Sequence, residues 1–535
     1  MDLTDIKNSF EQFRDKPFRP FQEESIKWLL GSDKRFTILE APTGSGKTLI
    51  AMAAGVANGS LTYMVHSKVL QNQVTEDFPE ARSLFGRANY SCTMDAELSC
   101  DECIHSKHYP CEYKYTCPYE VQKRVVLGAR LKILNYDYFL SEVNYVGRFR
   151  DANFLIIDEA DNLENTLINF CTLTFSQYAI NRLGLGEPAR KTAKSKEGIE
   201  PWRDFAQTAK YRVVSILNKL DFEIKDMGEI KGEFRIKKVK ERTRVKRLLE
   251  KIDLFLNNVD ETWIFDDRGE SDTFNTNYGT KYMPLQNYVF RPLWLNEDLA
   301  EEFLWKHGKK WVLMSASFLP QHILTKTLGI PPNEVDYQCT PSTFPPERRP
   351  IHIEPVANLT SKTMDAELPA LVQRIKEIVD SHPQDKGLIH AVSYKLANQI
   401  VNGVQNSRLT THNSSDRQAK LDYFVESGLP LVMVSPSMER GVNLEQDLCR
   451  FIIVAKAPFL NLGDKIVSSR VYSNGTVGRD WYQATMLLTV LQGCGRGMRS
   501  EDDYCEVYIL DEQFQRVYNK RPLLLPEWWR EAVTW

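Results

Sequence analysis

The stretch APTGSGKT, residues 41–48, has the residue types of a loop that binds the phosphates of a nucleotide. The apolar run FTILE precedes it and the pattern LIAMAAGVA follows it, which predicts a strand, a tight turn and a helix. Such a turn points backbone N–H groups and the positive end of a helix at one place, which suits phosphate. We expect Lys47 to neutralise the β- and γ-phosphates and the Thr48 hydroxyl to ligate Mg²⁺. The predicted loop also contains Thr43, Gly44, Ser45 and Gly46, with Ala41 where the strict pattern has a glycine.

Two adjacent acids end the apolar run in FLIIDEADN, further along the chain. A buried parallel strand would present such acids at its carboxyl end. Asp158 is expected to hold the metal through water, and Glu159 to orient or deprotonate the water that attacks the phosphate. An Asp-Glu pair is common at exposed strand ends, so it is informative only together with the phosphate loop. The two motifs together predict nucleotide hydrolysis.

Two later apolar runs also continue into polar residues and predict further strand ends. WVLMSASF ends in Ser315, Ala316 and Ser317. LVMVSPSMERGVNLEQD continues into three residues that we expect at the nucleotide site, namely Glu439, Gly441 and Asp447.

The segment LLTVLQGCGRGMRS places Gln492, Arg496 and Arg499 on a predicted helix. Two arginines three residues apart on a helix point the same way. Guanidinium groups supplied by a second domain would stabilise charge on the γ-phosphate, so that hydrolysis is coupled to the closure of a cleft. A surface arginine pair on a solvated helix is the alternative.

Five of the ten cysteines lie within one stretch, at Cys92, Cys100, Cys103, Cys111 and Cys117. Such a cluster can be a disulfide framework, a metal site or an accident of composition. The polar start MDLTDIKNSFEQFRDK has no signal-peptide pattern, and no run of about 20 uncharged apolar residues occurs. We therefore expect a cytoplasmic, reducing environment, which favours a metal over disulfides.

These motifs need a scaffold of alternating strands and helices, since each follows an apolar run and several precede helical patterns. A chain of 535 residues should contain about three or four packed units. We expect an α/β protein with parallel sheets covered by helices on both faces. The net charge of −3 is close to neutral, so any affinity for nucleic acid must come from local basic surfaces.

Together the motifs resemble those of a superfamily 2 helicase, specifically the XPD/DinG (Rad3-like) branch in a compact bacterial or phage form. The resemblance runs from FRPFQEESIKWL to ILDEQF, and it implies that Gln22, following Arg19, contacts the adenine. YMVHSKVLQNQ and GLIHAVSYK look like the strand-contacting motifs Ia and IV, and they contain His66, Ser67, Gln71, His390 and Ser393. The family commonly has DEAH at its second motif, whereas Asp161 here makes DEAD, which leaves its coupling to motif VI open.

The resemblance also implies a [4Fe-4S] cluster, which this family carries in an insert between motifs Ia and II. The implied ligands are Cys92, Cys103, Cys111 and Cys117, with Cys100 either a substitute for Cys103 or a spare thiol. Zinc is the alternative metal, although only Cys100 and Cys103 have the short spacing of a zinc knuckle. A stretch without metal is the third possibility.

The expected organisation is two RecA-like motor domains, the first of which carries two inserts. The first motor domain comprises 1–86, 121–162 and 296–344; a cysteine-rich insert covers 87–120, a helical Arch-like insert covers 163–295, and the second motor domain covers 345–535. The basic run RIKKVKERTRVKRLLEK in the second insert is either a solvated helix face or a contact with strand phosphates. Tyr109, Tyr113 and Tyr115 would stack on bases or pack around the cluster.

The resemblance implies an ATP-dependent DNA helicase that uses Mg²⁺, moves 5′ to 3′ on single-stranded DNA and acts in DNA repair or replication. Closure of the cleft around ATP and its release on hydrolysis would move the protein along the strand. We expect a monomer with no membrane contact that binds single-stranded and forked DNA, and a single-strand-binding protein as a further partner. One alternative is a DNA-stimulated translocase or remodelling ATPase without robust unwinding. The other is a metal-stabilised nucleic-acid binding module that has lost its motor activity.

Overall fold

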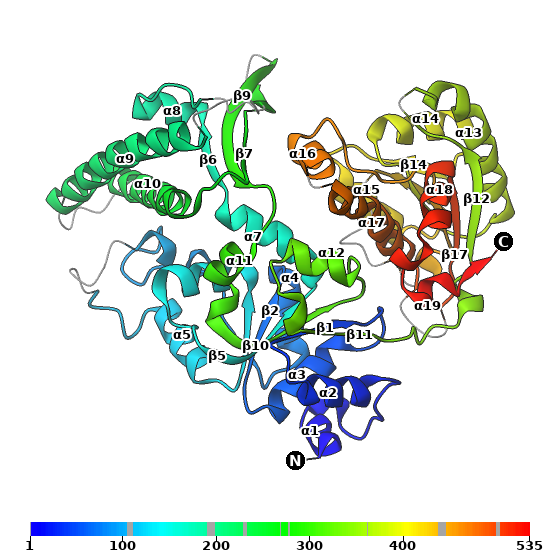
Figure 1. Ribbon diagram of the computed structural model, residues 1–535, viewed down its shortest axis with the longest axis horizontal. Helices are drawn as coiled ribbons and strands as arrows, with labels where there is room; N and C mark the ends of the chain where they lie inside the picture. The colour runs from blue at the N-terminus through cyan, green and yellow to red at the C-terminus, as the bar shows by residue number, and fades with distance from the viewer. Residues whose placement is uncertain are drawn as a thin grey trace.

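The structure is a computed structural model, and it describes most of the chain. The described residues are 2–103, 111–189, 198–227, 233–267, 269–276, 279–360, 362–436, 444, 446–473, 475–498 and 503–534. Figure 1 shows one α/β unit with α2 and α3 in the lower part of the view and a second with α13 and α18 on the right. A third unit, with the long helices α9 and α10, lies at the upper left.

The first motor domain is built on a seven-stranded sheet in which every pair of neighbouring strands is parallel. In sheet order the strands are β11 (Val335–Cys339), β1 (Phe36–Glu40), β10 (Gly308–Ser315), β5 (Ala152–Asp158), β2 (Leu61–Val65), β4 (Leu131–Asn135) and β3 (Arg82–Ser83). The strands β1, β2 and β5 have continuous buried runs because both faces of the sheet are covered there. Leu155 and Ile157 belong to one core cluster, whereas Phe154 and Ile156 belong to another, as alternation along a strand requires.

Helices cover both faces of this sheet. They are α1 (Leu3–Asn8), α2 (Gln22–Gly31), α3 (Lys47–Ala57), α4 (Lys68–Asp77), α5 (Pro118–Gly128), α6 (Tyr136–Ser141), α7 (Leu163–Cys171), α11 (Glu297–Phe303) and α12 (Gln321–Thr327). Strand register brings the functional strand ends together, because Glu40 pairs with Ser315 and Asp158 pairs with Met314. The carboxyl ends of β1, β10 and β5 therefore meet at one edge.

The second motor domain has its own seven-stranded parallel sheet. In sheet order its strands are β14 (Leu409–Thr411), β15 (Val432–Ser435), β13 (Gly387–His390), β16 (Phe451–Val454), β17 (Glu506–Asp511), β12 (Ile351–Ala357) and β18 (Val533–Thr534). Its helices are α13 (Met364–Ser381), α14 (Tyr394–Val404), α15 (Arg417–Glu426), α16 (Lys465–Ser473), α17 (Gly475–Cys494), α18 (Glu512–Lys520) and α19 (Glu527–Arg530). The two parallel sheets confirm the predicted α/β class with two RecA-like motor domains.

The segment expected to be a helical insert contains a sheet as well as helices. Its helices are α8 (Gln177–Leu183), α9 (Glu200–Asp226) and α10 (Glu233–Asn258), and its antiparallel strands are β6 (Leu173–Ser176), β7 (Trp263–Asp266), β8 (Gly269–Thr276) and β9 (Gly279–Pro292). Trp202, Trp263 and Phe290 pack where the helices meet the sheet. Helix α7, which lies in the same expected segment, packs instead in the core of the first sheet. The insert is thus a mixed α and β unit rather than a purely helical one.

Among the residues that the structure describes, no helix has the length and apolar character needed to span a membrane.

Candidate functional site

The loop between β1 and α3 has the backbone of a phosphate-binding turn. Gly44 and Gly46 adopt positive φ angles of 84° and 73°, which glycine tolerates and other residues rarely do. A Cβ atom on Gly46 would lie 2.3 Å from the side-chain nitrogen of Gln22, so a larger residue has no room. The Lys47 ammonium donates to the Ala41 carbonyl at 2.8 Å, which holds it over the loop. The loop is therefore a tight glycine turn with the Lys47 ammonium beside its backbone, and phosphate binding by it stays a prediction.

The N-terminal segment braces this loop through two side chains. The guanidinium of Arg19 donates to the Gly44 carbonyl at 2.6 Å, and the amide of Gln22 donates to the Ser45 carbonyl at 2.9 Å. The Gln22 oxygen also accepts from the backbone N–H of Arg19, at 2.9 Å. Gln22 is buried against the loop in this arrangement, so its contact with an adenine stays a prediction.

The two expected magnesium ligands are joined by a tyrosine that sequence reasoning missed. The hydroxyl of Tyr63, on β2, donates to a carboxylate oxygen of Asp158 at 2.6 Å and also forms a hydrogen bond with Thr48. Tyr63 is fully buried, and burial followed by the nearby Asp158 charge raises the pKa of its hydroxyl well above the usual range. The hydroxyl therefore stays protonated and can donate to the carboxylate. The other carboxylate oxygen of Asp158 accepts from the backbone N–H of Glu159 at 3.0 Å.

Asp161 connects the two motor domains. One of its carboxylate oxygens accepts from the Ser315 hydroxyl at 2.8 Å, and the other accepts from the side-chain amide of Gln492 at 3.0 Å. Ser315 ends β10 in the first domain, and its carbonyl accepts from the N–H of Ala41 at the start of the phosphate loop. Gln492 lies near the end of α17 in the second domain. A hydrogen-bonded path thus runs from the phosphate loop through Asp161 to the second domain.

Of the remaining predicted catalytic residues, the structure describes Glu159 and Arg496. Glu159 is exposed and has a positive φ of 51° at the start of a 3₁₀ turn, a conformation that residues other than glycine rarely adopt. Arg496 lies in the turn after α17. Burial is the main cause that lowers the pKa of His390 to about 4, and the positive charge of Arg496 acts in the same direction. Arg499, Glu439 and Gly441 lie outside the described residues, so their roles stay predictions.

Asp447 does not share the edge where the other motif residues lie. Its carboxylate accepts from the guanidinium of Arg450 at 2.6 Å, and Arg450 directly precedes β16. Asp447 therefore lies at the amino end of that strand, whereas His390, Asp158 and Ser315 end their strands. The described residues contain no bond between Asp447 and the phosphate loop, and its proposed role in nucleotide binding rests on the resemblance alone.

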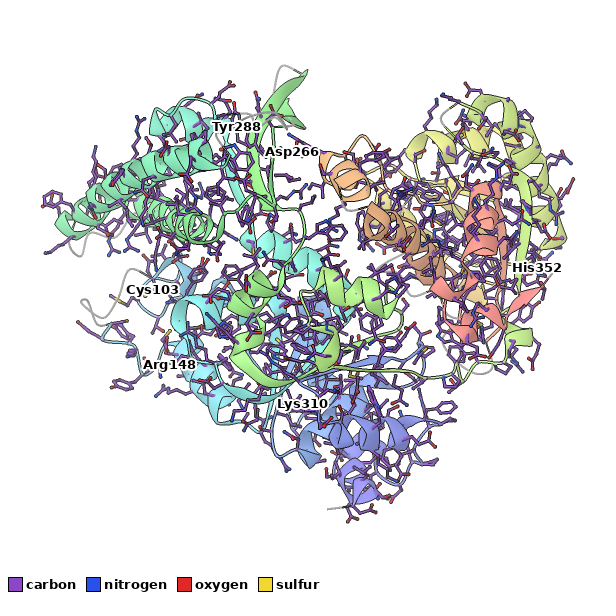
Figure 2. All side chains as sticks on the ribbon, viewed as in Figure 1. Cys103, Arg148, Asp266, Tyr288, Lys310 and His352 are labelled. Atoms are coloured by element: carbon purple, nitrogen blue, oxygen red, sulfur yellow. The ribbon has the colours of Figure 1, made fainter. Side chains whose placement is uncertain are left out.

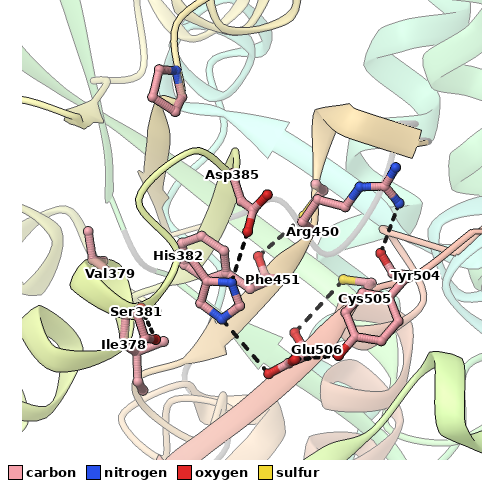
Figure 3. A network of polar contacts seen from close by, with 12 residues as sticks. Ile378, Val379, Ser381, His382, Asp385, Arg450, Phe451, Tyr504, Cys505 and Glu506 are labelled. Carbon is pink, nitrogen blue, oxygen red and sulfur yellow. Dashed lines mark hydrogen bonds and ion pairs between the residues drawn. The ribbon is translucent and has the colours of Figure 1, made fainter.

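A polar network surrounds Arg450 at this opposite edge of the second sheet (Figure 3). His382 contacts Asp385 at 3.1 Å and Glu506 at 3.8 Å, and its ring stacks on Phe451 with centroids 4.4 Å apart. These residues come from the amino ends of β13, β16 and β17 or from the loops that precede them. Because parallel sheets carry their ligands at the carboxyl ends of the strands, we assign this network a structural role.

A buried glutamate lies directly before the phosphate loop. Glu40 is only 3% exposed, and its carboxylate accepts a short hydrogen bond from the hydroxyl of Tyr337 on β11. Burial raises the pKa of Glu40 from its ordinary 4.5 to about 7, against the opposing effect of the Tyr337 hydrogen bond. The strand that feeds the phosphate loop therefore ends in a group that titrates near neutral pH.

Motifs Ia and IV begin helices. The hydroxyl of Ser67 accepts from the N–H of Leu70 at the start of α4, and that of Ser393 accepts from the N–H of Leu396 at the start of α14, each at 3.2 Å. Gln71 is fully buried and donates to Ser83 at 2.8 Å, so it connects α4 to β3. His66, by contrast, is exposed at the end of β2. Of these motif residues, His66 and Ser393 are exposed and therefore accessible to a strand.

The cysteine-rich insert brings Cys100 toward the other thiols. Its sulfur lies 3.6 Å from that of Cys117, and a β-bridge between Ser91 and Ser99 sets Cys92 beside Cys100. Cys111 lies with its sulfur 3.8 Å from the sulfur of Met94. Cys103 follows the 3₁₀ turn of Cys100–Glu102 and lies on the side of the molecule away from the second motor domain (Figure 2). The geometry therefore groups Cys100 with Cys92 and Cys117.

These thiols give a soft-metal site the right donor atoms, because thiolates are the ligands of iron–sulfur clusters and of zinc. Within the described stretches, which omit 104–110, no three His, Cys, Asp or Glu side chains lie close enough together to hold a single metal ion. The chemistry of the donor set fits a cluster, and the approach of the Cys100 and Cys117 sulfurs is the geometric observation that supports it.

The cysteine-rich insert contacts the helices of the second insert. Leu98 packs with Ile224 of α9 and with Ile236 and Val239 of α10, and Cys92 lies against this apolar cluster. An ion pair between Arg247 of α10 and Asp101 adds a polar contact. The two inserts therefore meet above the first motor domain. Tyr113 and Tyr115 are 43% and 76% exposed, so neither is packed inside the insert.

Comparisons with known proteins agree with this architecture. The DEAD/DEAH box helicase family model matches residues 19–177, and the helicase C-terminal domain model matches residues 375–532. The chain is 21% identical over 495 residues to the ATP-dependent DNA helicase CHL1 of Eremothecium gossypii, covering 78% of this chain and 60% of that protein. It is 23% identical over 226 residues to the ATP-dependent DNA helicase YoaA of Escherichia coli, covering 40% of this chain and 35% of that protein. It thus spans about 60% of the length of the CHL1 proteins that it matches.

Solved structures share the same fold. The structure of S. tokodaii Xpd4 superposes with a TM-score of 0.57 at 15% identity, covering 96% of this chain and 99% of that one. An XPD helicase structure gives a TM-score of 0.57 at 16% identity, covering 97% of this chain and all of that one. The shared fold includes both motor domains and the inserts between their segments.

Proposed function

We propose that the chain is an XPD/DinG-like superfamily 2 helicase that uses ATP to move along single-stranded DNA, which the two helicase family models and the similarity to ATP-dependent DNA helicases support. The single observation that carries this proposal is the Asp161 bridge between Ser315 and Gln492. It links the predicted hydrolysis motif of one domain to the helix that carries motif VI of the other. A nucleotide-driven change at the phosphate loop would therefore reach the second domain directly.

The chain's own residues divide the work of hydrolysis in this proposal. Lys47 and the backbone N–H groups of the loop would bind the phosphates, and Thr48 and Asp158 would hold Mg²⁺, a cation that would supply positive charge next to the phosphates. Glu159 orients or deprotonates the attacking water. Arg496 and Arg499 would close onto the γ-phosphate from the second domain, which makes closure depend on the nucleotide.

The strand would pass between the first motor domain and the two inserts. The apolar contacts of Leu98 with α9 and α10 and the ion pair between Asp101 and Arg247 support this, because they let the inserts enclose a chain of nucleotides. The exposed rings of Tyr113 and Tyr115 suit stacking on bases, and the basic face of α10 suits phosphates. The direction 5′ to 3′, a monomeric state and a single-strand-binding partner are part of this proposal and follow from the resemblance.

We propose that the cysteine-rich insert holds an iron–sulfur cluster on Cys92, Cys100, Cys111 and Cys117. Such a cluster would tie together chain segments that have few other contacts and would fix the insert against the second insert. The approach of the Cys100 and Cys117 sulfurs to 3.6 Å supports Cys100 as a ligand.

Two assays test the function. We expect ATP hydrolysis that single-stranded DNA stimulates and that Lys47→Ala abolishes, together with unwinding of forks that carry a 5′ tail. Hydrolysis without stimulation by DNA would refute the motor and favour a binding module. Stimulated hydrolysis without unwinding of 5′-tailed or 3′-tailed forks would favour the translocase instead.

A further inference from the structure

A buried arginine of the second motor domain lies at the junction with the first domain and its insert. Arg470, on α16, is only 4% exposed, and its guanidinium pairs with the carboxylate of Glu164 on α7 at 2.7 Å. It also donates to the Leu293 carbonyl at the end of the insert, at 2.8 Å. Its carbon Cζ lies 4.2 Å from the ring centroid of Trp294 and 4.7 Å from that of Trp481, in the corner between two nearly perpendicular rings.

The partners of Arg470 come from three parts of the chain. Glu164 begins α7 just after the hydrolysis motif, Trp294 follows the last strand of the insert, and Trp481 lies on α17 of the second domain. An apolar cluster surrounds the guanidinium and includes Ile323 of the first domain and Val467 of α16. Lys465, at the start of α16, donates to the Phe265 carbonyl of the insert as well. Arg470 is therefore the centre of a three-way joint.

Helix α17 links this joint to the nucleotide site. Gly478 lets α17 approach α16 closely, because a Cβ atom there would lie 1.9 Å from the carbonyl oxygen of Arg470. Trp481, in the joint, and Gln492, at Asp161, lie on the same helix, and 11 residues of helix span about 16 Å. The helix is thus held at both ends against the segment that runs from Asp161 to Glu164.

Stability alone gives little reason to bury this ion pair. Removing a guanidinium and a carboxylate from water costs several kcal/mol per ion, and apolar residues of similar volume often stabilise a protein as well or better. A planar guanidinium can pair with a carboxylate and pack against two aromatic rings at once, so it fixes how these partners are oriented. Lysine or an apolar side chain fixes that orientation less well. The joint is therefore better explained by a role in orienting α17 than by a role in stabilising the fold.

We propose that Arg470 is a positioning residue for the ATPase, which sets Gln492 against Asp161 through α17. This inference rests on the proposed function. It predicts that the Arg470 joint and the contact between Gln492 and Asp161 act as one unit. Once either one is lost, loss of the other should have little further effect on ATP hydrolysis. It also predicts that the second insert reports on the nucleotide state, because Trp294 and Leu293 belong to the same joint.

The test is a double-mutant cycle on the full chain with Arg470→Gln and Gln492→Ala, read by the kcat and KM for ATP in saturating single-stranded DNA and by Tm. We expect each single substitution to lower kcat about tenfold and to change KM less than about twofold. In a chain that already carries Gln492→Ala, Arg470→Gln should lower kcat by less than a further factor of about two. The changes in Tm should add, because the two sites make separate packing contacts. Arg374→Gln serves as control, since Arg374 pairs with Glu354 and Glu377 within the second domain.

Gly478→Ala provides an independent check that leaves every charge in place. It should push α17 away from α16 and reproduce the loss in kcat seen with Arg470→Gln. If Arg470→Gln lowers kcat by the same factor with and without Gln492, or if kcat falls only in step with Tm, the positioning role is wrong although the helicase proposal stands. A wild-type chain that hydrolyses no ATP with DNA would overturn both.

Discussion

Glu40→Gln tests whether a buried carboxyl under the phosphate loop limits stability at neutral pH. The native pKa of Glu40 is about 7 and its ordinary value is 4.5, so the folded state holds the proton more tightly than the unfolded state. The protonated carboxyl contributes stability below pH 4.5, and that contribution is lost as the pH rises through 7. A pKa difference of about 2.5 corresponds to about 3 kcal/mol.

Glutamine keeps the shape of the protonated glutamate and cannot ionise. The free energy of unfolding of Glu40→Gln relative to wild type should therefore rise by up to about 3 kcal/mol between pH 4.5 and pH 8. For a unit of about 200 residues this corresponds to roughly 6–10 °C in Tm. We expect the two proteins to melt at similar temperatures at pH 5 and the variant to melt at the higher temperature at pH 8.

The assay is thermal unfolding followed by circular dichroism at four pH values between 5 and 8, at one ionic strength and one heating rate. Glu302→Gln is the control, because Glu302 is exposed and pairs with Lys306 at the surface. Tyr337→Phe should shift the pH at which stability falls upward, since the Tyr337 hydrogen bond opposes the rise in pKa. Parallel curves of Tm against pH for wild type and Glu40→Gln would refute the reasoning.

Three further predictions concern the site itself. Tyr63→Phe should lower the DNA-stimulated kcat about tenfold and raise the Mg²⁺ concentration needed, because it removes a hydrogen bond to a charged group; an unchanged Mg²⁺ titration would contradict this. Cys100→Ser should lose the visible absorption and iron of anaerobically purified protein, whereas Cys103→Ser should keep both, and the reverse result would restore Cys103 as the ligand. Gly46→Ala should weaken ATP binding more than about tenfold in calorimetry, because φ is +73° there. Gly31→Ala, which meets no atom within 4 Å, should bind ATP like wild type.

The parts of the site that lie on one strand and the turn after it could be predicted from the sequence. The phosphate loop and the acids at Asp158 and Glu159 follow apolar runs, and local pattern is enough to place them at strand ends. The partners that reach these residues from elsewhere could not be predicted. Tyr63 lies within LTYMV, and the sequence does not say that β2 lies beside β5 or which face the ring occupies. Strand order and register decide that contact.

The two inserts show the same limit in different ways. Strand β8 reads GESDTFNT, and its polar residues give no alternating apolar pattern. The sequence therefore predicted only helices in this segment and not the hairpin that β8 forms with β9. In the cysteine-rich insert the spacing of the thiols is compatible with either Cys100 or Cys103. A 3₁₀ turn over Cys100–Glu102 turns Cys100 inward, where it is 2% exposed, and this turn cannot be read from the spacing.

The contact at Asp161 also explains why an aspartate can stand where the family commonly has a histidine. A carboxylate offers two oxygens, so it accepts from the Ser315 hydroxyl and the Gln492 amide at the same time. A neutral histidine has one donor and one acceptor, so with the same neighbours it could accept from Ser315 only if Gln492 turned its amide to accept in return. The aspartate thus keeps both neighbours as donors and adds a negative charge, which strengthens both hydrogen bonds. Coupling through this position therefore depends on the amide group of Gln492, and Gln492→Glu, which would face Asp161 with a second carboxylate, should uncouple the domains more severely than Gln492→Ala.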